Sequence, residues 1–104
     1  MDEITEYSRI RNQIELFEAG KLNLQFLIST LKGALAAIEG ANPEWVKAFR
    51  AEWWDLEQLN AYALDQKEIG VITDYQAFIE QPANQANILE ALNSMKELLS
   101  TQGA

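Results

Sequence analysis

Apolar residues recur at three- and four-residue steps along most of the chain, which is the spacing of one face of an α-helix. Four long segments have this pattern: residues 3–19, 24–39, 42–65 and 84–100. A shorter helical segment begins near Thr73, and no stretch indicates a sheet. Short connections favour antiparallel neighbours. The pattern therefore predicts one all-α domain over residues 1–104, an up-and-down helical bundle of four long helices plus one short helix.

Local signals predict where the later helices begin and end. The side chain of Asn42 is expected to cap the third helix, with Pro43 at its first position. Thr73 and Gln76 match a capping box at the start of the short helix. Pro82 lacks a backbone N–H and is expected to end or kink that helix.

The second helix has one strongly apolar stripe and one face of small residues. The stripe consists of Leu24, Leu27, Ile28, Leu31, Leu35 and Ile38, and the opposite face of Phe26, Ser29, Gly33 and Ala37. Gly33 costs up to ~1 kcal/mol of helix propensity relative to Ala, so we expect another helix to pack closely against it. No acidic residue occurs between Glu18 and Glu39. We therefore expect this helix to be the buried spine of the bundle.

The third helix combines a long apolar stripe with an unusual outer face. The stripe consists of Trp45, Phe49, Trp53, Leu56, Leu59 and Ala63. Asn60 falls inside it, where an unpaired amide would cost about 1–3 kcal/mol, so we expect it to bond a loop carbonyl or another side chain. Trp54 lies roughly 140° of helical rotation away from the stripe.

Two interpretations of Trp54 are open. An indole among carboxylates is typical of a binding face, because aromatic residues anchor interfaces and acidic neighbours select a basic partner. Alternatively, the third helix is central and packed on two sides, and Trp54 belongs to the core. The first interpretation gives these candidate partner-binding residues: Trp54, Asp55, Glu57, Gln58, Tyr62, Asp65 and Glu68.

The negative charge is concentrated in the second half of the chain. The formal net charge is −8, and residues 51–90 hold eight acidic residues against Lys67 alone, a net charge of −7. Such a field opposes binding to nucleic acid or to anionic lipid and favours a cationic partner. An ordinary solubilising surface is the alternative explanation.

The chain lacks cysteine and histidine. Their absence excludes disulfides, zinc thiolate or histidine sites, and catalysis by Ser-His-Asp or Cys-His groups. We therefore predict no metal, no cofactor and no enzymatic activity. The acidic N-terminus has no apolar signal region, and no apolar run reaches the roughly 20 residues that cross a bilayer. A cytoplasmic protein without membrane contact is expected.

Part of the chain resembles a known group of proteins. The resemblance lies in Leu31, Leu35, Ile38, the run Asn42-Pro43-Glu44-Trp45, Phe49, Trp53 and the segment from Leu56-Glu57 to Tyr62-Ala63-Leu64-Asp65. It is to small α-helical immunity proteins encoded beside bacterial polymorphic toxins, including those of contact-dependent growth inhibition systems. The resemblance implies a cytoplasmic protein that binds one cognate toxin domain, often a nuclease of the RNase type, as a monomer in a 1:1 complex. A non-catalytic helical adaptor or homo-oligomeric scaffold is the alternative.

Overall fold

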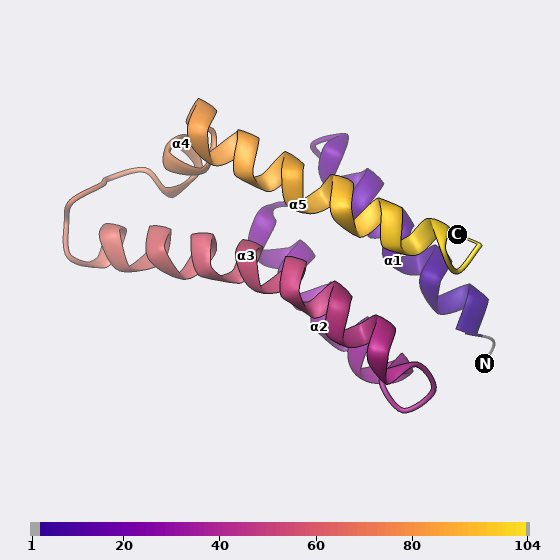
Figure 1. Ribbon diagram of the computed structural model, residues 1–104. Helices are drawn as coiled ribbons and strands as arrows, with labels where there is room; N and C mark the ends of the chain where they lie inside the picture. The colour runs from indigo at the N-terminus through magenta and orange to yellow at the C-terminus, as the bar shows by residue number, and fades with distance from the viewer. Residues whose placement is uncertain (1–2, 104) are drawn as a thin grey trace.

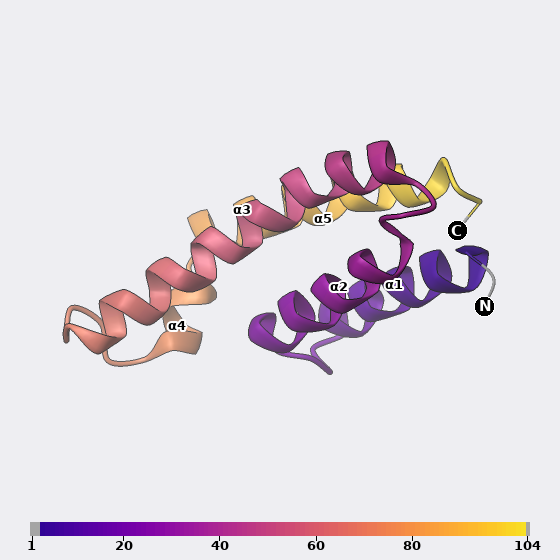
Figure 2. The same cartoon turned by 90° about the horizontal axis from the view of Figure 1, so that it is seen from below.

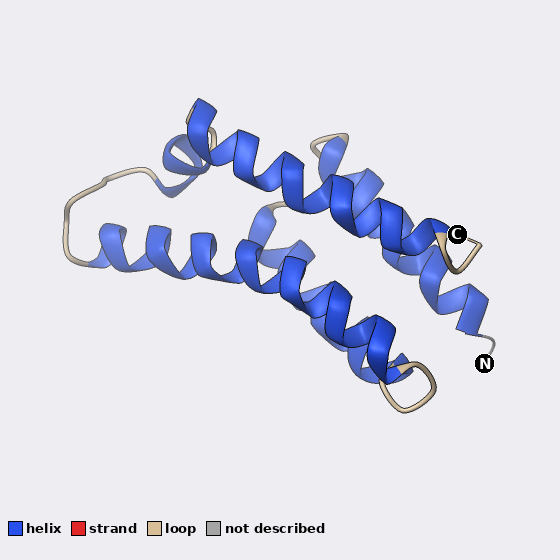
Figure 3. Ribbon diagram, viewed as in Figure 1, coloured by secondary structure: helices blue, strands red, loops and turns tan. Residues whose placement is uncertain are grey.

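Residues 3–103 fold into five helices. The computed structural model describes the backbone of residues 3–103 and the side chains of residues 6–103. The helices are α1 (Glu3–Glu18), α2 (Leu24–Ile38), α3 (Pro43–Glu68), α4 (Tyr75–Ile79) and α5 (Pro82–Ser100). Within residues 3–103 there is no strand, as Figure 3 shows. The prediction of an all-α fold with four long helices and one short helix is confirmed.

The helices form two pairs that lie against each other. α1 packs against α2, and α3 packs against α5, with α4 bridging the far ends of α3 and α5 (Figure 1). The pairs meet where α2 packs on α3 and where α1 touches α5. The molecule is elongated, with extents of 44 × 24 × 19 Å. The C-terminal part of α3, together with α4, extends beyond the α1–α2 pair (Figure 2).

A single apolar core joins both pairs. Its fully buried members include Ile10 on α1, Leu27 on α2, Phe49 on α3 and Met95 on α5. Burying a large aliphatic or aromatic side chain stabilises the fold by about 1.5–3 kcal/mol, so this core is the main source of stability. Within residues 3–103, no helix is long and apolar enough to cross a membrane.

The expected role of α2 as a buried spine is wrong. Its apolar stripe is buried as predicted, but the helix contacts only α1 and α3 among the described helices. Phe26 is 53% exposed, and Ser29, Gly33 and Ala37 also face solvent. A Cβ built on Gly33 would meet no atom within 4 Å. Among the helices of residues 3–103, none packs on this face of α2.

Asn42 does not cap α3, contrary to the prediction from the sequence. Its side chain makes no cap hydrogen bond to the helix backbone. Instead, Nδ2 donates to the Tyr7 hydroxyl at 2.9 Å and to Oε1 of Gln102 at 3.3 Å. Asn42 therefore joins the start of α3 to both ends of the described chain. Pro43 occupies the first turn, as predicted.

The boundaries around α4 also differ from the predictions. Asp74, not Thr73, caps α4, and its carboxylate accepts from the Ala77 N–H at 3.2 Å. A carboxylate is as good a helix cap as a hydroxyl, and here Asp74 occupies the position next to the helix. Pro82 begins α5 and does not kink α4, because a missing N–H has no cost in a first helical turn.

Asn60 has the partner that its buried position requires. The Tyr75 hydroxyl donates a hydrogen bond to the Asn60 amide oxygen. Asn60 is only 8% exposed. This contact ties α4 to α3 and confirms the predicted structural role of the amide.

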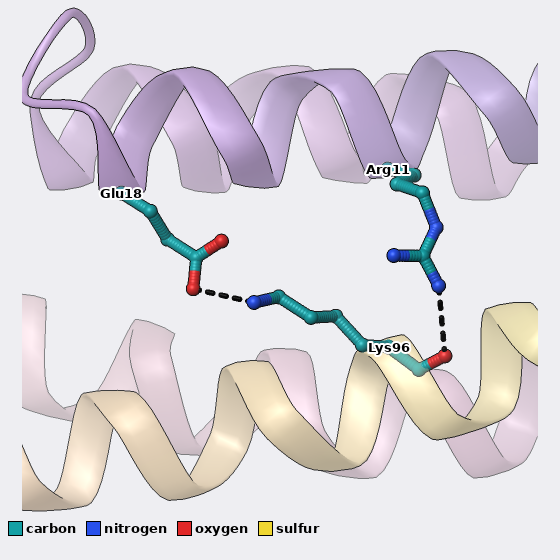
Figure 4. A network of polar contacts seen from close by, with 3 residues as sticks. All are labelled: Arg11, Glu18 and Lys96. Carbon is teal, nitrogen blue, oxygen red and sulfur yellow. Dashed lines mark hydrogen bonds and ion pairs between the residues drawn. The ribbon is translucent and has the colours of Figure 1, made fainter.

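Polar contacts support the junction between α1 and α5 (Figure 4). Lys96 Nζ on α5 forms an ion pair with Glu18 on α1 at 2.6 Å, and Arg11 donates to the Lys96 carbonyl at 3.4 Å. Both side chains of the ion pair are partly exposed, so it is worth little, up to about 1 kcal/mol. Apolar burial, not this pair, holds α1 and α5 together.

Candidate partner-binding surface

The three tryptophans of α3 have different environments. The indole N–H of Trp45 donates to the Leu98 carbonyl at 2.9 Å, and that of Trp53 donates to the Ile28 carbonyl at 3.0 Å. Both rings are buried, whereas Trp54 is 52% exposed. The interpretation of Trp54 as a core residue is therefore wrong, and its indole is available for contact.

Trp54 lies at a boundary between charges of opposite sign. It borders a shallow hollow of about 570 Å³ lined by Glu39, Pro43, Glu44, Lys47, Arg50, Ala51 and Trp54. Arg50 in this hollow is paired with Glu39 at 2.9 Å. Lys47 and Arg50 thus precede Trp54 on α3, whereas Asp55, Glu57, Asp65 and Glu68, which have no ionic partner among the described side chains, follow it. Trp54 is at the edge of the acidic surface and not at its centre.

Four of the predicted residues share one exposed ridge of α3. Trp54, Gln58, Tyr62 and Asp65 are spaced by four, four and three residues, which places them on one helical face. All four are exposed. We refer to Trp54, Gln58, Tyr62 and Asp65 as the outer ridge. The Tyr62 ring also contacts Phe78 of α4, with 5.8 Å between ring centroids, so its orientation is partly fixed.

The other predicted acids lie on opposite flanks of this ridge. Asp55 faces α5 and borders a hollow of about 310 Å³ with Glu52 and Glu90. Glu57 faces α2 and borders a hollow of about 320 Å³ that also contains Lys32. The structure therefore does not bring Asp55 and Glu57 together.

Glu68 follows Glu57 by eleven residues, about three helical turns, and so lies on the same flank of α3. Its side chain is exposed. The end of α3 that carries Glu68 extends beyond α2 (Figure 2). A partner in contact with the distal part of the outer ridge can therefore also reach Glu68.

The acidic residues of this half of the molecule have no ionic partner inside the described part of the chain. The ion pairs among residues 6–103 join Arg9 to Glu6, Arg50 to Glu39 and Lys96 to Glu18. None involves an acid between residues 51 and 90. The negative potential of this region is therefore available to an incoming cationic surface.

Acidic side chains of α3 and α5 repel one another where Glu52, Asp55 and Glu90 line the same hollow. Partial burial raises the pKa of Glu52, and the charges of Asp55 and Glu90 raise it further. A cation that approached this flank would relieve the repulsion. Within the described residues, no group of three or more His, Cys, Asp or Glu side chains is arranged to hold a metal ion.

Two surface features were not predicted from the sequence. Ile69 and Val71, at the end of α3, are 69% and 66% exposed. Aliphatic residues on both sides of Gly70 were the available signal in the sequence.

The second feature is a hollow of about 680 Å³ between the α1–α2 loop and the α4–α5 region. Its apolar floor includes Phe17, Leu24, Ile79 and Ile88. Residues of α1, α2, α4 and α5 line this hollow. The spacing of residues within any one helix therefore could not have predicted it.

Comparison with known proteins gives no relative: no family model, no curated protein and no solved structure matches this chain.

Proposed function

We propose that this protein is a cytoplasmic immunity protein that binds and neutralises a cognate toxin domain of a contact-dependent growth inhibition system. The toxin is expected to be a nuclease of the RNase type. One observation supports this proposal above all: the outer ridge of α3 exposes Trp54 and Tyr62 beside acidic residues that have no ionic partner among the described side chains.

A nuclease must hold phosphate groups, so its active site carries lysine and arginine. An acidic protein surface of similar shape competes with the nucleic acid for those residues. Bound there, the immunity protein excludes the substrate without any chemistry of its own, and it needs no cofactor. A single copy of each protein is sufficient.

Aromatic and acidic residues contribute differently to such a complex. Desolvated Trp and Tyr side chains are typical energetic anchors, and their loss mainly raises the dissociation rate. Rim charges mainly raise the association rate, from a neutral range of about 10⁵–10⁶ M⁻¹s⁻¹, and the gain falls with added salt. We assign the first role to Trp54 and Tyr62 and the second to Asp55, Glu57, Asp65 and Glu68, with Gln58 between them.

Affinity capture tests this proposal directly. The tagged protein is used to capture partners from the strain that carries its gene, at low and at high salt, and the partners are identified by mass spectrometry. We expect one basic toxin domain, whose nuclease activity the purified protein abolishes at equimolar concentration. Recovery of no basic partner at either salt concentration would refute the proposal.

Charge reversal tests the role of the acidic surface. Glu57→Lys and Asp65→Lys are expected to lower the association rate about tenfold or more at low salt and much less at high salt. Glu15→Lys, an exposed acid on α1, is the matched control and should have a small effect. Equal rates for the Glu57, Asp65 and Glu15 variants at low salt would exclude the acidic surface as the contact.

A further inference from the structure

The end of α3 is a rigid turn. Gly70 has a φ of +83°, a conformation that residues with a Cβ rarely adopt. Its N–H donates to the Lys67 carbonyl at 3.2 Å, and the Val71 N–H donates to the Gln66 carbonyl at 2.9 Å. These two bonds define a Schellman motif, which satisfies the last carbonyl groups of the helix. The backbone on both sides of Gly70 is therefore fixed.

The side chains of this turn depart from the usual pattern. In a Schellman motif, the residue after the glycine commonly packs against an apolar residue in the last turn of the helix. Here the corresponding helical positions are Asp65 and Gln66, which offer no apolar surface. Val71 is accordingly 66% exposed, and Ile69 is 69% exposed. Two branched aliphatic side chains are thus held in solvent on a rigid backbone.

This turn lies at the end of the elongated molecule opposite to the chain termini (Figure 1). We define Ile69, Gly70 and Val71 as the aliphatic tip. The residues that flank it carry a net negative charge: Asp65, Glu68 and Asp74 are acidic, and Lys67 is the one base among residues 65–74. None of the three acids forms an ion pair with a described side chain. The tip is thus a convex apolar feature with a negative margin.

We propose that the aliphatic tip inserts into an apolar hollow on a cationic protein partner, and that lysine or arginine side chains around the hollow pair with Asp65, Glu68 and Asp74. This inference rests on the proposed function, because the partner is the basic toxin domain. The tip adds an aliphatic anchor at the end of α3 to the aromatic anchors Trp54 and Tyr62. Charge favours this occupant over a second copy of the chain, whose own tip has the same negative margin.

The test uses the basic partner recovered by the wild-type protein as its probe. In the double variant Ile69→Ser/Val71→Ser, Gly70 and the backbone bonds of the turn are retained. We expect this variant to bind the purified partner at least about tenfold more weakly, through faster dissociation, and by the same factor at low and high salt. Leu89→Ser on α5, where the native side chain is 53% exposed, is the matched control and should bind normally.

The possible results separate this inference from the proposed function. If the wild-type protein recovers no basic partner, the proposed function fails, and the inference fails with it. If the partner is recovered but the double variant and the Leu89 variant bind it equally well, only the inference is overturned. Circular dichroism of each variant is the control that its helical content is unchanged. Sedimentation gives one further result that would overturn the inference. If the wild type self-associates and the tip variant does not, the tip joins two copies of this chain and does not bind the toxin domain.

Discussion

The contact between Tyr75 and Asn60 shows how much depends on one hydroxyl group. Asn60 lies within the apolar stripe of α3, and the Tyr75 hydroxyl satisfies its amide oxygen. In Tyr75→Phe the ring remains but this hydrogen bond is lost. We expect the free energy of unfolding to fall by about 1–3 kcal/mol, the cost of an unsatisfied buried amide. Urea denaturation followed by circular dichroism measures this change. An unchanged midpoint would show that water replaces the Tyr75 hydroxyl as the hydrogen-bond donor to the Asn60 amide oxygen.

The same hydroxyl makes the free energy of unfolding depend on pH in the alkaline range. Burial, with a smaller effect of the Glu57 charge, raises the pKa of Tyr75 from 10.0 to about 12. Between these values the folded state keeps a proton that the unfolded state has released, so the free energy of unfolding falls as pH rises. We expect the wild type to lose stability from pH 10 to 12 more steeply than Tyr75→Phe. Parallel curves for the two proteins in this range would contradict the assignment.

Glu52 is expected to reduce stability at neutral pH. Burial and the charges of Asp55 and Glu90 raise its pKa, so the folded state disfavours its ionised form. In Glu52→Gln the free energy of unfolding should rise by roughly 0.5 kcal/mol at pH 7 and low salt. The gain should vanish at a pH low enough to protonate Glu52 in both states. Glu15→Gln, on an exposed part of α1, is the control and should show no comparable gain.

At the level of whole helices, substitution of alanine for glycine is expected to stabilise the fold at one position and destabilise it at another. Gly33 lies inside α2, outside the left-handed region, with open space where a Cβ would go. Gly33→Ala should raise the free energy of unfolding by about 0.5–1 kcal/mol. Gly70 ends α3 at φ +83°, so Gly70→Ala should lower it by about 1–2 kcal/mol. Thermal denaturation compares both variants, and a loss in Gly33→Ala would indicate a contact on that face of α2.

The helices were predictable because each carries its own periodic pattern and local end signals. The apolar stripe of α2 and the central polar residue of α3 were both identified correctly. The local errors lie at the boundaries around α4, and the other errors concern relations between helices. Asn42 has the right chemistry for a cap, but the nearby Tyr7 and Gln102 engage its amide instead. The residues next to Asn42 in the sequence give no sign that distant side chains compete with the helix backbone for its hydrogen bonds.

The candidate site was predictable in composition but not in arrangement. Helical rotation alone placed Trp54 outside the core stripe and indicated an acidic surface. It did not show which neighbouring helices the flanks of this surface would face, α5 at Asp55 and α2 at Glu57. Nor did it show that the end of α3 projects beyond α2, because that depends on the different lengths of packed helices (Figure 2).

For the molecule as a whole, charge governs association between copies. With a net charge of −8, and most of it on one half, two copies repel each other wherever these halves meet. We expect a monomer in sedimentation velocity experiments at low salt. A dimer that persists at low salt would instead support the homo-oligomeric scaffold. Sedimentation of Phe26→Ser would then test whether the exposed face of α2 forms the contact.

The hydrogen bonds of Asn42 have a further consequence for the connectivity of the chain. Through Tyr7 and Gln102, this one side chain bridges the first helix and the segment after the last one. The first turn of α1 and the last turn of α5 lie at the same end of the molecule (Figure 1). Proteins with neighbouring ends tolerate circular permutation. A short linker between the present ends, with a new opening in the α1–α2 loop, should therefore give the same fold in a different chain order.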